Sequence, residues 1–110
     1  MSPVIYTGLR REDGGAAVHK QVDDLAPTDL AMRNDLRNHS PDGPEWGYAG
    51  SGPAQLSLAL LADMLGDEAA QDLHQRFKRD VVARFPREGF AISAEAIDAW
   101  AAALETERRG

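Results

Sequence analysis

The segment that leads into an apolar run in the middle of the chain concentrates groups that could bind a ligand. Residues 46–53 read WGYAGSGP and are followed directly by the apolar residues 54–65. Gly47, Gly50 and Gly52 permit backbone conformations that other residues rarely adopt. A loop that ends at a helix N-terminus can present unpaired N–H groups and the positive end of the helix dipole. The sequence therefore predicts a binding surface for an anion or a carboxylate at this junction.

Seven residues of this junction are candidates for contact with a ligand or a partner. They are Trp46, Gly47, Tyr48, Gly50, Ser51, Gly52 and Gln55. Ser51 offers a hydroxyl group, and the N–H groups of residues 54–56 are expected to be unpaired at the helix start. The composition also has an architectural interpretation, in which the glycines let Trp46 and Tyr48 fold back over the core. Both interpretations stay open at this level.

The pattern of these residues does not match a catalytic motif. The glycine spacing is neither a dinucleotide fingerprint nor a Walker A loop. Ala49 stands where a nucleophile elbow has its first glycine, so Ser51 is interpreted as a turn or cap residue. His19, His39 and His74 lack metal-binding spacing, and the sequence contains no cysteine. We therefore predict no catalytic residue, no metal site and no cofactor.

Two charged groups have a plainer interpretation than a functional one. Glu45 precedes Trp46 and could be a carboxylate against an apolar wall, but a surface or capping role is commoner. A basic group on the second half of a predicted helix could bind nucleic acid, or be a solvated helix end balanced by nearby acidic residues. Its members are Arg76, Lys78, Arg79, Arg84 and Arg87.

Composition favours a single acidic domain over residues 1–110. Hydrophobic residues make up 43% and charged residues 27% of the 110 positions. The net charge of −6 argues against direct nucleic-acid binding, for which a basic face is expected. The first residues do not resemble a signal peptide, and no apolar run is long enough to cross a membrane. We expect a cytoplasmic protein, and its oligomeric state stays open.

The elements that must position the junction are read from the hydrophobic pattern. Residues 4–7 and 16–22 are predicted strands joined by a hairpin connection, with Lys20 on the apolar side of an edge strand. A short helical turn is expected over residues 28–33. Phe90 to Ile92 is a brief apolar piece compatible with a third strand.

Three helices are predicted after the junction. The first starts at Pro53 with Gly52 as its cap and is apolar around most of its circumference. Its narrow polar stripe, formed by Gln55, Ala59, Ala62 and Asp63, is a surface through which a dimer could form. The others are expected over residues 68–84 and 94–106, the last with Ser93 as its cap. We therefore expect an α+β fold: a small antiparallel hairpin, with or without a third short strand, packed on three helices.

Residues 46–61, WGYAGSGPAQLSLALL, resemble the signature of a family of small domains found in bacteria, archaea, phages and plasmids, the domain of unknown function 6166. The likeness extends back to Tyr6, Gly8, Arg10, His39, Ser40 and Pro41, and forward to Phe77 and Lys78. Pro44 departs from an expected aromatic residue and His74 from an expected tyrosine. The resemblance implies no reaction or cofactor. It adds Lys78 to the candidate binding residues, beside Trp46, Tyr48, Ser51 and Gln55.

These observations lead to two functional hypotheses. The first is a non-enzymatic accessory protein of a phage or plasmid that binds a host protein, for example as an inhibitor of a defence complex such as a CRISPR effector. Small size, acidic charge and the mobile-element resemblance favour it. The alternative is a small-ligand or nucleotide-binding domain that uses the glycine-rich loop and helix N-terminus at residues 47–56.

Overall fold

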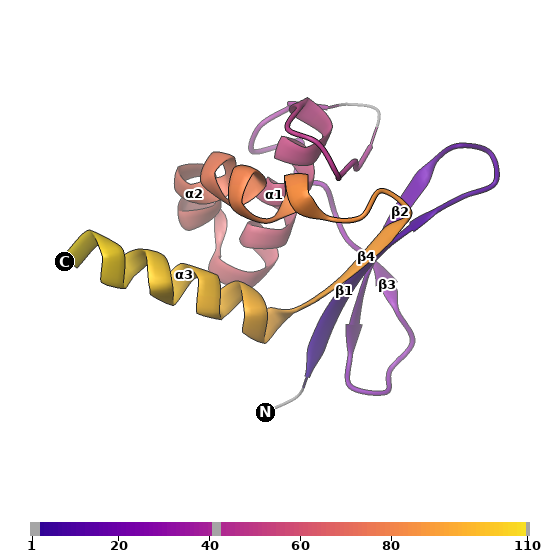
Figure 1. Ribbon diagram of the computed structural model, residues 1–110. Coiled ribbons are helices and arrows are strands. Elements are labelled where there is room, and N and C mark those ends of the chain that lie inside the picture. The colour runs from indigo at the N-terminus through magenta and orange to yellow at the C-terminus, as the bar shows by residue number, and fades with distance from the viewer. Residues whose placement is uncertain (1–2, 41–42, 110) are drawn as a thin grey trace.

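The chain folds into one antiparallel sheet with helices on one side, as predicted for an α+β protein (Figure 1). The computed structural model describes residues 3–40 and 43–109, so Pro41 of the family-like motif lies outside the described residues. In chain order the elements are β1 (Val4–Arg10), β2 (Ala16–Val22), β3 (Thr28–Asp29), α1 (Ser51–Leu65), α2 (Asp67–Asp80), the 3-10 turn η1 (Val82–Arg84), β4 (Gly89–Ser93) and α3 (Ala94–Arg109). The strand order is β3-β2-β1-β4.

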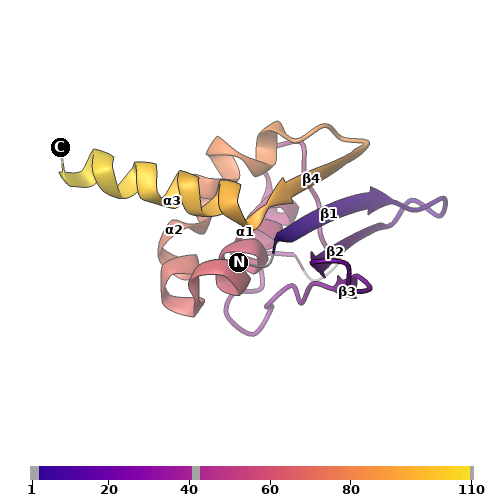
Figure 2. The same ribbon diagram turned by 90° about the horizontal axis from the view of Figure 1, so that it is seen from below.

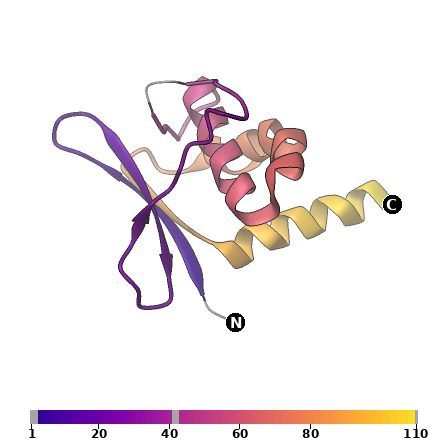
Figure 3. The same ribbon diagram turned by 180° about the vertical axis from the view of Figure 1, so that it is seen from behind.

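The helices cover one face of the sheet and leave the other open. Figure 2 and the view from behind in Figure 3 both place α1, α2 and α3 on the same side. Strand residues alternate between the two faces, and Tyr6 and Val18 point inward, where they are buried. Phe90 faces inward with them, because it pairs with Gly8 across the ladder from Val18. The core therefore lies between the inner sheet face and α1.

Helix α1 is buried on all sides. Each residue from Gly52 to Ala62 is buried, including the polar Gln55 and Ser57. The predicted polar stripe is wrong, because Gln55 and Ala59 are 0% exposed and only Asp63 of that set reaches solvent freely. The sheet and α2 pack on two sides of α1, and the segment 30–40 adds Leu30, Met32 and Leu36 on a third. A dimer through that stripe is thereby excluded.

Lys20 points toward the helices because it forms an ion pair there with Asp63 of α1. Its Nζ lies 2.8 Å from Asp63 Oδ2, and Tyr6 Oη donates to the same oxygen at 2.6 Å. Burial and this carboxylate raise the pKa of Tyr6 well above its usual range. The three side chains join the C-terminal end of α1 to β1 and β2.

Several predicted boundaries change in the structure. The helical turn over residues 28–33 is wrong: Thr28–Asp29 is a strand that pairs with β2, and Leu30 N donates to Val18 O at 3.0 Å. Hydrogen bonding to the free edge of β2 therefore outweighs the helix propensity of these residues. Helix α2 ends at Asp80 rather than Arg84, because the chain turns at Val81 and buries Val82 through η1. The third strand is confirmed as β4, and Ser93 caps α3 by accepting the Ala96 N–H at 3.0 Å.

We predict that Leu60→Ala lowers the free energy of unfolding by about 2–5 kcal/mol, because it leaves a cavity in the tightly packed α1. Leu60 is 0% exposed. Leu25→Ala is the control, since Leu25 is 65% exposed and its truncation should change stability by about 0.5 kcal/mol at most. Urea unfolding of the two variants measures the difference, and equal losses would contradict the described packing of α1.

Candidate functional site in the glycine-rich loop

The loop before α1 is held by backbone contacts that require glycine. Gly47 has φ 86°, and its N–H donates to Val82 O at 3.1 Å. A Cβ at this position would lie 2.8 Å from Arg87 Cγ and 3.1 Å from Phe85 O. Any other residue would therefore combine an unfavourable φ with a clash. Gly47 brings the loop against the segment that precedes β4.

The first turn of α1 is buried from Gly52 onward, and only Ser51 at its start is exposed. The helix begins at Ser51 with Gly50 as its cap, earlier than predicted, and Ala54 N donates to Gly50 O at 3.0 Å. Gly52 is buried, and a Cβ there would lie 2.6 Å from Glu45 Cβ. The prediction of unpaired, accessible N–H groups at residues 54–56 is wrong, because these residues belong to the buried body of the helix. The architectural interpretation accounts for these glycines.

Trp46 belongs to the hydrophobic core. It is 0% exposed and meets the Phe90 ring edge-on, with the ring centroids 5.0 Å apart. The Arg10 guanidinium lies over its other side, 4.3 Å from the ring centroid. The indole Nε1 is buried and makes no hydrogen bond with the described residues. Trp46 can thus contact a partner only if the loop moves.

Arg10 ties the loop to the sheet. Its Nη1 lies 2.8 Å from both carboxylate oxygens of Glu45, and its Nε donates to Arg87 O at 2.8 Å. The Arg10 and Glu45 side chains are about one-third exposed, so this ion pair lies at the rim of the core. Sequence reasoning noted Arg10 only as part of a family-like strand motif. Glu45 is accordingly a structural partner of Arg10.

The middle of the motif, residues 47–51, reaches the surface, whereas Trp46, Gly52 and Pro53 are buried. Tyr48 is 40% exposed, and the Arg87 guanidinium lies 5.6 Å from its ring centroid. Ser51 is exposed, and its hydroxyl makes no hydrogen bond within the described part of the chain. Gly47 and Gly50 are partly exposed, whereas Gly52 and Gln55 are buried with Trp46. That this loop binds a ligand or partner stays a prediction, with Tyr48 and Ser51 as its accessible side chains.

The Gln55 side chain holds the segment 32–40 against α1 through hydrogen bonds. Its Oε1 accepts the His39 N–H at 2.8 Å and the Ser40 N–H at 3.2 Å, and its Nε2 donates to Met32 O at 2.6 Å. One buried amide therefore satisfies backbone groups that a strand or helix would otherwise satisfy. Arg33 adds a second attachment through Asp67 at the start of α2, at 2.8 Å, and lowers the pKa of that carboxylate.

A pair of histidines makes a third attachment of the same segment. His39 Nε2 lies 3.0 Å from His74 Nε2. His74 Nδ1 lies 3.0 Å from the carbonyl oxygens of Ala70 and Gln71, so it must carry a proton. His74 Nε2 is then the acceptor and His39 Nε2–H the donor. The sequence offered no signal for this pair, because its members lie 35 residues apart.

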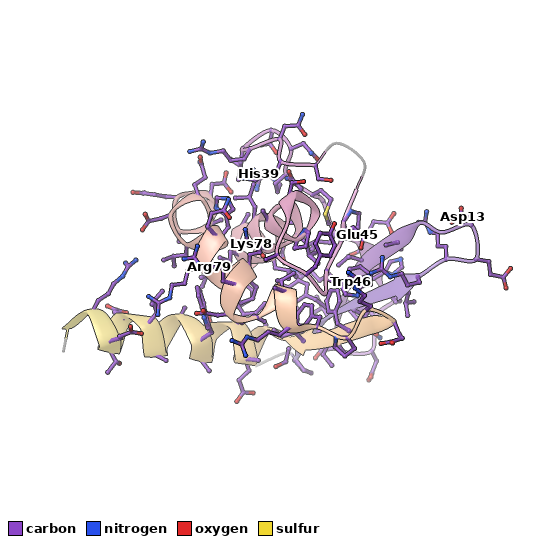
Figure 4. The ribbon with its side chains drawn as sticks, turned by 45° about the horizontal axis from the view of Figure 1, so that its top comes forward. Asp13, His39, Glu45, Trp46, Lys78 and Arg79 are labelled. Carbon is purple, nitrogen blue, oxygen red and sulfur yellow. The ribbon has the colours of Figure 1, made fainter. Side chains whose placement is uncertain are left out.

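The predicted residue Lys78 lies on α2, within the range predicted for the second helix. Figure 4 shows it on the helix layer together with Arg79, while Glu45 and Trp46 lie beside the sheet. Its charge, with that of Arg37 and His74, lowers the pKa of His39, after the larger effect of burial.

A broad hollow of about 800 Å³ lies between the segment around Arg37 and the first half of α2. Its lining is largely polar and includes none of the predicted site residues. Within residues 3–40 and 43–109, no group of three or more histidine or acidic residues is placed to hold a metal ion. The same part of the chain contains no helix with the length and apolarity needed to span a bilayer.

The model of the family of unknown function DUF6166 matches residues 6–103 of the chain. The match covers the sheet, α1, α2 and most of α3, so the chain belongs to this family. No curated protein and no solved structure matches the chain.

We predict that Trp46→Phe costs less than about 1.5 kcal/mol of stability, because it keeps the aromatic packing and removes an unpaired buried donor. Trp46→Ala should cost about 3–5 kcal/mol, because it empties the site beneath Arg10. Thermal and urea unfolding of both variants tests the comparison. A loss for Trp46→Phe as large as that for Trp46→Ala would mean that the indole N–H has a partner, such as a buried water.

We predict that acidification below about pH 6.5 loosens the segment 32–40. The folded protein lowers the pKa of His39 from 6.5, so the unfolded chain binds the proton more readily. The contribution of neutral His39 to the free energy of unfolding is therefore fully present above pH 6.5. It is lost as the pH falls from 6.5 toward the lowered pKa of His39 in the folded protein. Hydrogen exchange of this segment at about pH 7.5 and about pH 5.5 measures the effect. His39→Ala should abolish the dependence and His19→Gln should retain it; the reverse result would refute the assignment.

Proposed function

We propose that this member of the DUF6166 family acts by binding another protein through the open face of its sheet. One observation carries the proposal: the outward positions of the three longer strands, β1, β2 and β4, bear no lysine, arginine, aspartate or glutamate, and the one acidic outward residue of the sheet, Asp29, lies on the short outermost strand β3, 3.2 Å from His19. These positions are Ile5, Thr7, Leu9, Ala17, His19, Gln21, Gly89, Ala91 and Ser93. Charged residues make up 27% of the chain, so a solvated sheet face would be expected to carry several of them.

The centre of the outer sheet face is apolar. Ile5 is 44% exposed and Leu9 57% exposed, both on β1 in the middle of the sheet. Depletion of charged residues around exposed apolar side chains is the compositional mark of an interface core. The alternating pattern also explains why these side chains cannot turn inward, since Tyr6 and Gly8 occupy the inner face.

The biological setting that we propose is that of an accessory protein of a phage or plasmid. The family-like motif supports this setting, and the acidic net charge of −6 would favour approach to a basic host protein. Inhibition of a host defence complex, such as a CRISPR effector, is the role that fits a small binding protein best. The covered first turn of α1 weighs against the alternative of a nucleotide or anion bound at residues 47–56.

The proposal predicts that Ile5→Thr/Leu9→Thr weakens binding to the host partner at least about tenfold, which corresponds to 1.4 kcal/mol. Threonine keeps the strand propensity and removes the apolar surface. The partner is the protein that the tagged full chain recovers stoichiometrically from lysates of defence-positive hosts. Protection of an infecting phage is measured in parallel.

Two variants control for general effects. Leu25→Thr removes an equally exposed leucine in the turn after β2, and Ser51→Ala alters the exposed part of the glycine-rich loop. Both should bind like the unmodified chain. Loss of binding in Ser51→Ala with full binding in Ile5→Thr/Leu9→Thr would move the site to the loop. Failure to recover a partner or to protect phage in any defence-positive host would refute the proposal.

A further inference from the structure

The outer sheet face formed by β1, β2 and β4 is bounded by carboxylates at both ends of the β1–β2 hairpin. Glu12 and Asp13 lie in the turn between the strands, and Asp23 and Asp24 in the turn that follows β2. All four are exposed, and none forms an ion pair with another described residue. Figure 1 shows the two turns at opposite ends of the sheet, and Figure 4 shows Asp13 at the hairpin tip, away from the helices.

The cations of the hairpin do not neutralise these ends. Arg10 is bound to Glu45, and Lys20 points inward to Asp63. Arg11 shares the tip with Glu12 and Asp13, which leaves a net negative charge there. Strands of seven residues at about 3.3 Å per residue place the two acidic ends about 20 Å apart.

This charge pattern argues against a second copy of the chain as the occupant of the face. Two sheets that pack face to face in the aligned manner about a two-fold axis have their hairpins within about 30° of the same or the opposite direction. In both arrangements acidic ends meet acidic ends, and the carboxylates repel each other. The face therefore selects a partner of opposite charge.

Resting on the proposed function, we infer that the partner docks with a nucleic-acid-binding surface. Its complementary surface has an apolar strip flanked by lysine or arginine side chains about 20 Å apart, matching the two acidic ends. A cluster of exposed lysine and arginine side chains is the electrostatic footprint of a nucleic-acid-binding surface. The chain thus occupies the place of nucleic acid on its partner, and excludes it.

Neutralisation of the acidic ends tests the inference on the partner recovered by the full chain. Glu12→Gln/Asp13→Asn and Asp23→Asn/Asp24→Asn should each weaken binding at least about tenfold and slow association, with a reduced dependence on salt. Asparagine tolerates the φ of 53° at Asp23. The control Glu68→Gln/Asp72→Asn makes the same charge change on α2 and should leave binding unchanged. Surface plasmon resonance at low and high salt supplies the rates.

Competition with a short DNA or RNA duplex completes the test. The partner alone should bind the duplex, and saturation with the chain should displace it. A partner that binds no nucleic acid, or a ternary complex, overturns the inference. Binding that depends on Ile5 and Leu9 but not on the acidic ends also overturns it, while the proposed function stands. Recovery of no partner, or sedimentation of the chain as a dimer broken by Ile5→Thr/Leu9→Thr, overturns both.

Discussion

The burial of α1 on every side is the constraint on which the rest of the structure depends. A helix with eleven consecutive buried residues needs neighbours all round, and the sheet, α2 and the segment 30–40 supply them. The polar groups within the helix must then be satisfied inside the protein. Ser57 Oγ donates to Pro53 O at 2.8 Å within the helix, and Gln55 bonds the backbone of the segment that covers it.

This constraint assigns most of the distinctive residues to architecture. Trp46 fills the space between Arg10 and Phe90, and Gly47 and Gly52 allow the loop to approach its neighbours closely. Of the polar side chains among the candidate binding residues, Gln55 supports α1 and the segment that covers it. Besides the exposed Tyr48 and Ser51, the outer sheet face remains accessible, and β1, β2 and β4 carry no charged residue there between two acidic turns.

Local signals in the sequence were sufficient where short-range physics decides the structure. The alternation of residues 16–22 predicted β2 with its observed bounds, and Ser93 predicted the start of α3. The helical turn predicted over residues 28–33 was wrong, because pairing with the edge of β2 outweighed a weak helical tendency. The open sheet face also could not be predicted, since Ile5 and Leu9 resemble core residues until the position of the helices is known.

The sequence by itself determined the α+β class, the family, the acidic charge and the position of the glycine-rich junction, because composition, periodicity and motif are local properties. Only the tertiary structure decided which groups of that junction are buried and which are accessible. Whether an N–H group is free or a tryptophan is exposed depends on contacts such as those of Arg10 with Glu45 and of Gln55 with the segment 32–40. Such contacts join residues 15 or more positions apart, and no local pattern encodes them.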